Sequence, residues 1–303
     1  MILGLVGSEM CIRDRCSEIT LPTGIDKEGR DRTAVCCLSS LNLETYDEWK
    51  DDENFVPDVM RFLDNVLTDF TEKAPESFSD AVYSALKERS VGLGVMGLHS
   101  FFQQKMIPFE SVMSKVWNKK IFESIQKQVD QASKDLADER GACPDAADYG
   151  INERFSNKTA IAPTASISII CGGTSPGVEP IAANSYTHKT LSGSFNVRNK
   201  YLSKLLEKHG KNDDETWSSI TTNQGSVSHL DFLTQQEKDV FKTAFELDQK
   251  WIVELGADRT PHISQAQSIN IFIPADIHKR DLHQIHFQAW KKGLKSLYYC
   301  RSK

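Results

Sequence analysis

The chain has 303 residues, of which 39% are hydrophobic and 26% charged, a composition typical of globular proteins with one large domain or two smaller ones. Its formal net charge of −6 argues against a nucleic acid as principal partner, because binding to that polyanion relies on clustered Lys and Arg. Seven cysteines in a chain of this length do not indicate a disulfide framework, and no apolar run approaches the roughly 20 residues of a membrane span. We therefore expect a cytoplasmic protein in a reducing environment that binds neither nucleic acid nor membrane.

The first fifteen residues, MILGLVGSEMCIRDR, form a segment of their own. The SEMCIRDR portion resembles translated adapter sequence, and we interpret residues 1–15 as a non-native leader. A signal peptide is not expected, because the apolar run covers only about six residues and no basic segment precedes it.

Residues 16–44 read CSEITLPTGIDKEGRDRTAVCCLSSLNLE, a turn-rich loop that leads into a hydrophobic strand. Cys16 opens this stretch and Glu18 follows it closely, while Cys36 and Cys37 lie in the strand. Taken alone, a cysteine in such a chain is most often a small buried hydrophobe, and Glu18 would be a solvated loop acid. That interpretation is kept for Cys37, which we expect to face the core on the opposite side of the strand from Cys36.

Helical periodicity follows in three segments. The first runs from Pro57 to Phe70, and its apolar stripe is expected at Val59, Phe62, Leu63, Val66, Leu67 and Phe70. Two further helices are predicted over residues 77–88 and 110–139, the longer one ending at Gly141.

Residues 92–97 read GLGVMG and match the dinucleotide-binding fingerprint GxGxxG in form. We reject that function because a charged helical segment precedes the motif in place of a strand. Gln and Lys also follow it in place of the acidic residue required about 20 positions later. Tight backbone turning or helix packing explains these glycines better.

A short buried strand is predicted over Thr159 to Ala162, followed at once by Pro163, Thr164, Ala165, Ser166, Ile167 and Ser168. Small hydroxyl residues between a strand and a helix N-terminus offer backbone N–H groups that cradle phosphate. A run of Ser and Thr by itself is more often an ordinary loop.

The last hundred residues predict two helices followed by a strand, a helix and a strand. The helices cover 199–209 and 234–255, the second opening on a capping box of Thr234 and Glu237 and closing at Gly256. A strand over 268–273, a helix over 281–294 and a strand over 296–299 then form a parallel βαβ unit. His278, His283 and His286 show no ligand spacing and are expected at the surface.

Four motifs, in the same order, resemble the large subunits of class I ribonucleotide reductases. The first joins Cys16-Ser17-Glu18-Ile19 to Cys36-Cys37-Leu38-Ser39 with Asn42-Leu43, and the second is VGLGVMGL at 91–98. The third is TAIAPTASISII with SPGVEP at 175–180, and the fourth is LKSL followed by Tyr298-Tyr299. The segment QAQSINIFI is also similar, so the resemblance runs from Cys16 to about Arg301. It departs at Asp14, where the family has Asn.

The resemblance implies roles for particular residues. Cys16 would form the thiyl radical that removes the ribose 3′-hydrogen, and Glu18 would act as general base. Cys36 would be one thiol of the pair that delivers two electrons and becomes a disulfide. Tyr298 and Tyr299 would relay the radical, although an anonymous Tyr-Tyr pair usually only packs. The implied substrate-binding residues are Ser17, Pro163, Thr164, Ala165, Ser166 and Ile167.

The resemblance also implies an architecture and partners. Residues 16–303 would form the C-terminal part of a ten-stranded α/β barrel with Cys16 on a central finger loop. The substrate would be a ribonucleoside diphosphate, and a metal-containing small subunit would supply the radical to a homodimer of large subunits. Thioredoxin or glutaredoxin would be the reductant, while ATP and dNTP effectors would bind a missing N-terminal part. No cofactor or metal would bind this segment directly, and the chain alone would be inactive.

Two alternatives remain open. One is an inert structural fragment, because half a barrel leaves sheet edges unpaired. The other is a cobalamin-dependent ribonucleotide reductase, which makes its radical beside the cysteine and needs no tyrosine relay. The Tyr298-Tyr299 pair favours the type that depends on a small subunit.

Overall fold

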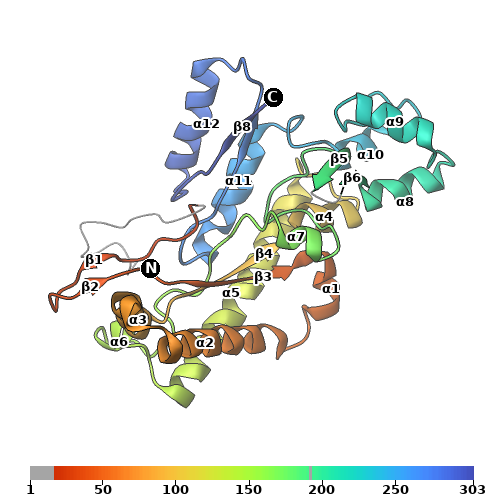
Figure 1. Ribbon diagram of the computed structural model, residues 1–303. Helices are drawn as coiled ribbons and strands as arrows, with labels where there is room; N and C mark the ends of the chain where they lie inside the picture. The colour runs from red at the N-terminus through yellow and green to blue at the C-terminus, as the bar shows by residue number, and fades with distance from the viewer. Residues whose placement is uncertain (1–16, 191–192) are drawn as a thin grey trace.

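The computed structural model describes residues 17–190 and 193–303 (Figure 1). The predicted leader and Cys16 therefore lie outside the described residues.

A row of parallel extended segments organises the fold. Strand β3 (Cys37–Asn42) pairs in parallel with β4 (Val91–Met96). Single parallel bridges continue the row, from Leu93 to Thr159 and from Ile161 to Gln267. Strand β7 (Ile271–Ile273) then pairs in parallel with β8 (Cys300–Ser302). The predicted segment 159–162 is thus buried and paired through bridges, and within the described residues the row does not close into a barrel.

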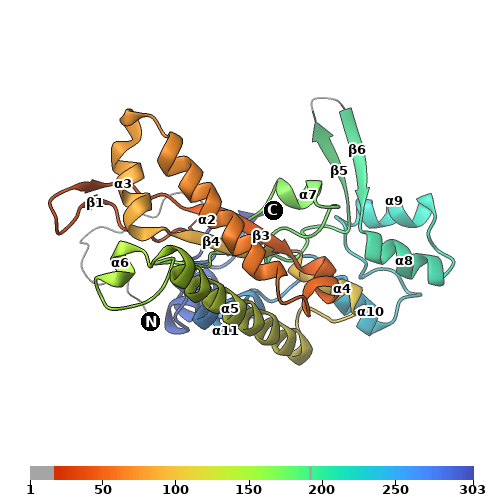
Figure 2. The same cartoon turned by 90° about the horizontal axis from the view of Figure 1, so that it is seen from below.

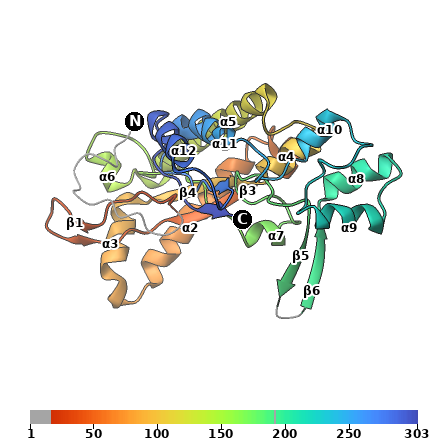
Figure 3. The same cartoon turned by 90° about the horizontal axis from the view of Figure 1, so that it is seen from above.

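Helices supply the crossovers that parallel neighbours require. Helix α2 (Phe55–Lys73) packs against α5 (Val112–Arg140), which packs against α11 (Gln249–Arg259), which in turn contacts α12 (Lys279–Lys291). Figure 3 shows α5, α11 and α12 along one side of the molecule, next to β3 and β4. The large hydrophobic core fills the space between these helices and the row of strands.

The remaining elements are short. Two antiparallel hairpins are β1 (Gly24–Ile25) with β2 (Asp31–Arg32), and β5 (Ser185–Thr190) with β6 (Gly193–Arg198). The second projects from the body beside α8 and α9 (Figure 2). The other helices are η1 (Leu43–Thr45), α1 (Tyr46–Trp49), η2 (Glu76–Phe78), α3 (Ser79–Glu88), α4 (Leu98–Gln104), α6 (Pro144–Ala147), α7 (Ile167–Ile170), α8 (Lys200–Lys208), α9 (Asp214–Thr222), α10 (Gln235–Val240) and η3 (Thr260–His262).

The predicted helix starting at Pro57 is present, but its buried face differs from the prediction. Phe62 is 61% exposed and Val66 37% exposed, while Met60 and Asp64 are fully buried. The reason is electrostatic: the buried face includes the Asp64 carboxylate, which apolar periodicity cannot identify as an interior group.

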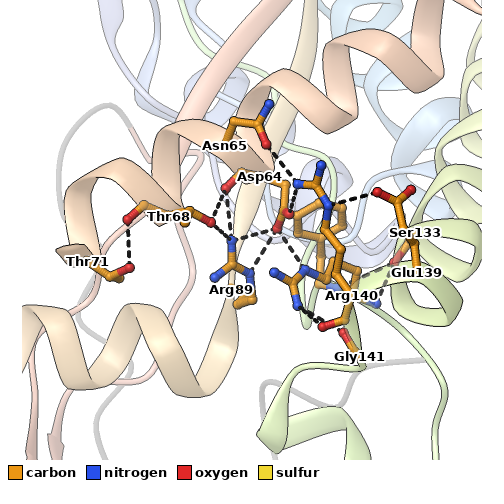
Figure 4. A network of polar contacts seen from close by, with 11 residues as sticks. Asp64, Asn65, Thr68, Thr71, Arg89, Ser133, Glu139, Arg140 and Gly141 are labelled. Carbon is orange, nitrogen blue, oxygen red and sulfur yellow. Dashed lines mark hydrogen bonds and ion pairs between the residues drawn. The ribbon is translucent and has the colours of Figure 1, made fainter.

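The fully buried Asp64 is the centre of a cluster of three arginines, of which Arg89 is also buried (Figure 4). Its Oδ1 accepts hydrogen bonds of 2.9 Å from the Nε atoms of Arg89 and Arg154, and its Oδ2 accepts one of 2.9 Å from Nη1 of Arg140. Burial raises the pKa of Asp64, but the hydrogen bonds and charges of Arg154 and Arg89 outweigh burial and lower it. The cluster therefore ties α2 to the ends of α3 and α5 and to the loop after α6.

The glycine-rich stretch is a buried strand, which corrects the prediction of turning or helix packing for its first two glycines. All six residues of β4 are buried. A Cβ at Gly94 would overlap the carbonyl oxygen of Ala160, and one at Gly92 would overlap the side chain of Leu38. Only Gly97 turns the chain, with φ of 82° at the start of α4.

The single helix predicted over 234–255 is wrong. The capping box of Thr234 and Glu237 is confirmed, but α10 ends at Val240, and α11 begins after Asp248, which caps it by accepting from the Lys250 N–H. Buried Phe241, Ala244 and Leu247 hold the intervening turns in the core. Gly256 lies inside α11, where it allows close packing against Ile269, and does not end the helix.

Other predictions hold with shifted boundaries. Gly141 ends α5 with φ of 86°, as expected. The parallel βαβ unit is confirmed, although its last strand is β8 and the predicted residues 296–299 precede it. Residue 298 nevertheless already pairs, because the Tyr298 N–H donates to the Ile269 carbonyl at 2.8 Å.

Across the part of the chain that the structure describes, no helix is both long and apolar enough to cross a membrane.

Candidate functional site

The finger segment, residues 17–23, contacts the segment over residues 265–268 that leads into β7. The carbonyl oxygen of Glu18 accepts from the Ala266 N–H at 2.9 Å. Ser17 has a positive φ of 63°, and its carbonyl oxygen accepts from the Ser296 hydroxyl at 3.0 Å. The finger segment is thus held from both sides, by residues 265–268 and by the residues before β8.

Glu18 is buried in this arrangement. Its side chain is 2% exposed, and its Oε2 accepts a hydrogen bond of 2.6 Å from the Ser268 hydroxyl. Burial raises the pKa of Glu18, with the Ser268 hydrogen bond acting in the opposite direction. A carboxylate in such a setting is suited to accept a proton. Cys16, the residue expected to react beside it, lies outside the described residues.

Cys36 lies directly before β3 and is a half-buried free thiol. Its sulfur accepts a hydrogen bond of 3.2 Å from Nε2 of Gln265, and Oε1 of Gln265 accepts from the Thr20 N–H at 3.1 Å. Burial raises the pKa of Cys36 to about 12. Cys37 is partly buried and packs against the large hydrophobic core, as predicted for the residue facing the other way.

The predicted phosphate loop follows the bridged segment at Ile161. Thr164 has a positive φ of 51°, and its hydroxyl oxygen accepts from the Gly177 N–H at 2.7 Å, which folds the loop back on itself. Pro163 is half-buried, and Ala165, Ser166 and Ile167 are exposed. Among the described contacts, the backbone N–H groups of residues 165–167 have no protein acceptor. They precede or begin α7, whose N-cap is Ser166.

The two tyrosines form a closely packed, tilted ring pair before β8. Their ring centroids are 3.7 Å apart at an interplanar angle of 35°. Tyr298 is half-buried and Tyr299 is 52% exposed. The Tyr299 N–H donates to Oδ1 of Asn270 at 3.0 Å, which adds to the backbone pairing with the strand before β7.

Sequence reasoning missed four polar residues of this site. Gln265 and Ser268 bind the finger segment, and Asn270 binds Tyr299. Nδ2 of Asn270 also donates to the buried carboxylate of Glu179 at 2.6 Å. Burial raises the pKa of Glu179 to about 7. The available signal was the polar content of QAQSIN, where four of six residues in a buried segment are polar.

Metal ligation finds no support in the described ranges. No group of three or more His, Cys, Asp or Glu residues there is arranged to hold an ion. His278 accepts from the Arg280 N–H as the N-cap of α12, and His286 bonds the Leu282 carbonyl, so both have surface helix roles.

The segment over residues 265–270, which leads into β7 and carries a single bridge at Gln267, brings the separate parts together. Its side chains contact the finger segment at Thr20 and Glu18, the thiol of Cys36, and the backbone of Tyr299. The neighbouring bridged segment at Ile161 leads into the loop at 163–167. This segment is thus in contact with a buried carboxylate, a free thiol and one of a pair of oxidisable phenols, which are groups suited to proton and electron transfer.

Comparison with known proteins identifies close relatives. The family model "Ribonucleotide reductase, barrel domain" matches residues 14–154 and 145–300. The ribonucleoside-diphosphate reductase large subunit of Invertebrate iridescent virus 6 is 54% identical over 292 residues, which cover 95% of this chain and 30% of the relative. The large chain 2 of Saccharomyces cerevisiae is 31% identical over 327 residues, covering 95% and 37%.

A solved structure agrees with these matches. The Actinobacillus ureae class Id ribonucleotide reductase alpha subunit aligns with a TM-score of 0.86 at 39% identity, over 95% of this chain and 52% of that one. The chain therefore spans between 30% and 52% of the length of these three proteins.

Proposed function

The chain belongs to the ribonucleotide reductase large-subunit family through its barrel domain, and we propose that it carries the catalytic face of an enzyme that reduces ribonucleoside diphosphates to 2′-deoxyribonucleoside diphosphates. The observation that carries this proposal is the segment over residues 265–270, which contacts Glu18, Cys36 and Tyr299 at once. The reaction consumes one dithiol and yields one disulfide and one water.

Each part has a proposed role. Cys16, as a thiyl radical, removes the ribose 3′-hydrogen. Glu18 accepts the 3′-hydroxyl proton, and the 2′-hydroxyl leaves as water after taking a proton from the dithiol pair. Cys36 is one thiol of the pair that supplies the two electrons. The burial of Glu18 supports the base role, because a raised pKa makes a carboxylate a stronger proton acceptor.

The loop at 163–167 is proposed to hold the substrate diphosphate together with Ser17. Three backbone N–H groups without a protein acceptor, at residues 165–167, support this role because phosphate oxygens accept such bonds well. The positive φ of Thr164 also supports the phosphate-binding role, because strained backbone conformations of this kind cluster at ligand-binding sites.

Tyr298 and Tyr299 are proposed to relay a radical from a metal-containing small subunit to Cys16. Their ring separation of 3.7 Å supports direct transfer between the two phenols. The exposure of Tyr299, at 52%, is what a radical entry point from a partner requires. The pair argues against the cobalamin-dependent alternative, which needs no relay, and the resemblance to a class Id alpha subunit argues the same way.

The proposal extends to the working enzyme. It would be a dimer of large subunits in the cytoplasm, reduced by thioredoxin or glutaredoxin and regulated by ATP and dNTP effectors. No metal or other cofactor is proposed for the barrel itself. The inert-fragment alternative applies to the isolated chain and not to a subunit of full length.

A chimeric subunit tests the proposal. Residues 16–303 replace the matching segment of the Invertebrate iridescent virus 6 large subunit, and the unmodified viral subunit is the positive control. With small subunit and dithiol, the chimera should form deoxyribonucleoside diphosphate, and Glu18→Gln should lower kcat by about 10²- to 10⁴-fold with substrate affinity retained. An active Glu18→Gln chimera with normal kcat would refute the base role, and an inactive but folded chimera would refute the function.

A further inference from the structure

Gln265 is a fully buried glutamine that links the finger segment to Cys36. Its Oε1 accepts from the Thr20 N–H at 3.1 Å, and its Nε2 donates to the Cys36 sulfur and to the Val91 carbonyl oxygen, each at 3.2 Å. The partners fix the orientation of the amide, because a backbone N–H only donates and a backbone carbonyl only accepts. Nε2, the donor end of the side chain, must therefore face Cys36.

Resting on the function proposed above, we propose that Gln265 is a positioning residue for the redox thiol. It sets the place of the finger segment relative to the Cys36 sulfur and donates the hydrogen bond that stabilises the Cys36 thiolate. Neither role follows from the sequence motifs, because Gln265 lies 229 residues from Cys36 along the chain.

The electrostatic surroundings explain why the thiolate needs this donor. Thiolate is the form that gives up electrons and attacks disulfides. Burial opposes it most strongly, and the neighbouring Cys37, Glu88 and Glu18 also raise the pKa of Cys36. The Gln265 hydrogen bond acts in the opposite direction. Removing the donor would leave the thiol protonated over a wider pH range.

Gln267 provides the matched comparison. It lies two residues further along the same segment and is 5% exposed, but its side chain bonds Arg259 and Thr260 and has no described contact with Cys36. A merely structural role for Gln265 predicts that substitution at either glutamine changes stability alone. A positioning role predicts that only Gln265 changes the chemistry of Cys36.

The test is site-resolved alkylation of the folded 303-residue chain with iodoacetamide between pH 7 and pH 10. Fragment ions separate Cys36 from Cys37, so the adjacent cysteine is an internal control. In Gln265→Met, which keeps the length but lacks the donor, alkylation of Cys36 at a given pH should slow about tenfold and its pH profile should move to higher pH. Cys37 in that variant, and Cys36 in Gln267→Met, should match the wild type.

Gln265→Glu is a second variant, included in case Gln265→Met does not fold. Its carboxylate still accepts a hydrogen bond from the Thr20 N–H, while the donor to Cys36 is lost. The same slowing of Cys36 is expected there. Three outcomes would overturn the proposal in favour of a structural role. They are an unchanged pH profile of Cys36 alkylation, faster alkylation of both cysteines, and failure of both variants to fold as judged by circular dichroism. Turnover is not needed, so an inactive chimera with a normal Gln265 effect would refute the reductase function and leave this inference standing.

Discussion

The Ser268 hydroxyl donates a 2.6 Å hydrogen bond to the carboxylate of Glu18, across 250 residues of sequence. This contact fastens the finger segment to the strand before β7. It also tunes the carboxylate, since burial raises the pKa of Glu18 and the Ser268 hydroxyl partly offsets that rise. The pKa of Glu18 is thus raised, but by less than burial alone would raise it, so the carboxylate stays ionised to lower pH than it would without the Ser268 hydroxyl.

The first prediction concerns this offset. Ser268→Ala in the chimeric subunit removes a donor to the ionised carboxylate, so the pKa of Glu18 should rise further. A base must be deprotonated to act, so the acid limb of the kcat/KM profile should move to higher pH, with the rate at alkaline pH little changed. A pH–rate series checks this. A profile that keeps its acid limb, or moves it to lower pH, would show that Glu18 is not the titrating base.

The second prediction uses Glu179, whose pKa burial raises to about 7. An acid whose folded pKa is raised binds its proton more tightly when folded, so its stability contribution is full near pH 4 and is lost as pH rises to 7. Glu179→Gln keeps the acceptor for Asn270 and removes this titration. The wild type should therefore lose up to about 3 kcal/mol of unfolding free energy relative to Glu179→Gln between pH 4.5 and pH 8.

Urea unfolding at several pH values measures that difference, with exposed Glu76→Gln as the control. Glu88, whose pKa burial also raises to about 7, should behave in the same way as Glu179. Parallel stability curves for the wild type and Glu179→Gln would refute the prediction.

The third prediction concerns the arginine cluster. Asp64→Asn leaves Arg89, Arg140 and Arg154 close together without their shared carboxylate, and breaking such a buried pair costs about 3–5 kcal/mol. Asp69, an exposed carboxylate on the same helix paired with Lys73, provides the control. Asp69→Asn should change the unfolding free energy by less than about 1 kcal/mol in the same urea titration. Equal changes in unfolding free energy at the two positions would mean that the arginine cluster does not stabilise the fold.

The fourth prediction separates relay from packing at the tyrosines. Tyr298→Phe or Tyr299→Phe keeps the aromatic ring and its packing and removes the phenolic hydrogen needed for coupled proton and electron loss. In the chimera, turnover should fall to background while Tm and substrate affinity stay near the unsubstituted values. A Phe variant that works at a near-normal rate with its small subunit would exclude the relay and reopen the cobalamin-type alternative.

The sequence predicted the family, which the comparisons confirm, and most helices, because amphipathic stripes and stop signals such as Gly141 are local features. The sequence-based prediction failed where contacts between distant segments determine the local structure. The glycines of β4 are there because Ala160 and Leu38 approach closely, and the break after Val240 depends on burial of Phe241 and Ala244. Neither the close approach to the glycines nor the burial of Phe241 and Ala244 can be read from the neighbouring sequence.

For the same reason, only part of the candidate site was predicted from the sequence. Motif residues such as Glu18 and Cys36 were found through resemblance. The polar residues that bind them, Gln265 and Ser268, come from a segment more than two hundred residues away and belong to no motif that names a role. Their function is visible only once that segment lies against the finger segment.

The central claim is that this barrel performs nucleotide reduction through a thiyl radical at Cys16, and one substitution tests it most directly. In the chimeric subunit, Cys16→Ser replaces the thiol with a hydroxyl that cannot form the radical at accessible cost, and substrate binding should survive. Deoxyribonucleoside diphosphate formed with small subunit and dithiol is measured beside equilibrium binding of the ribonucleoside diphosphate. The account predicts normal binding with no product above background, and product formation at the unsubstituted rate would contradict it.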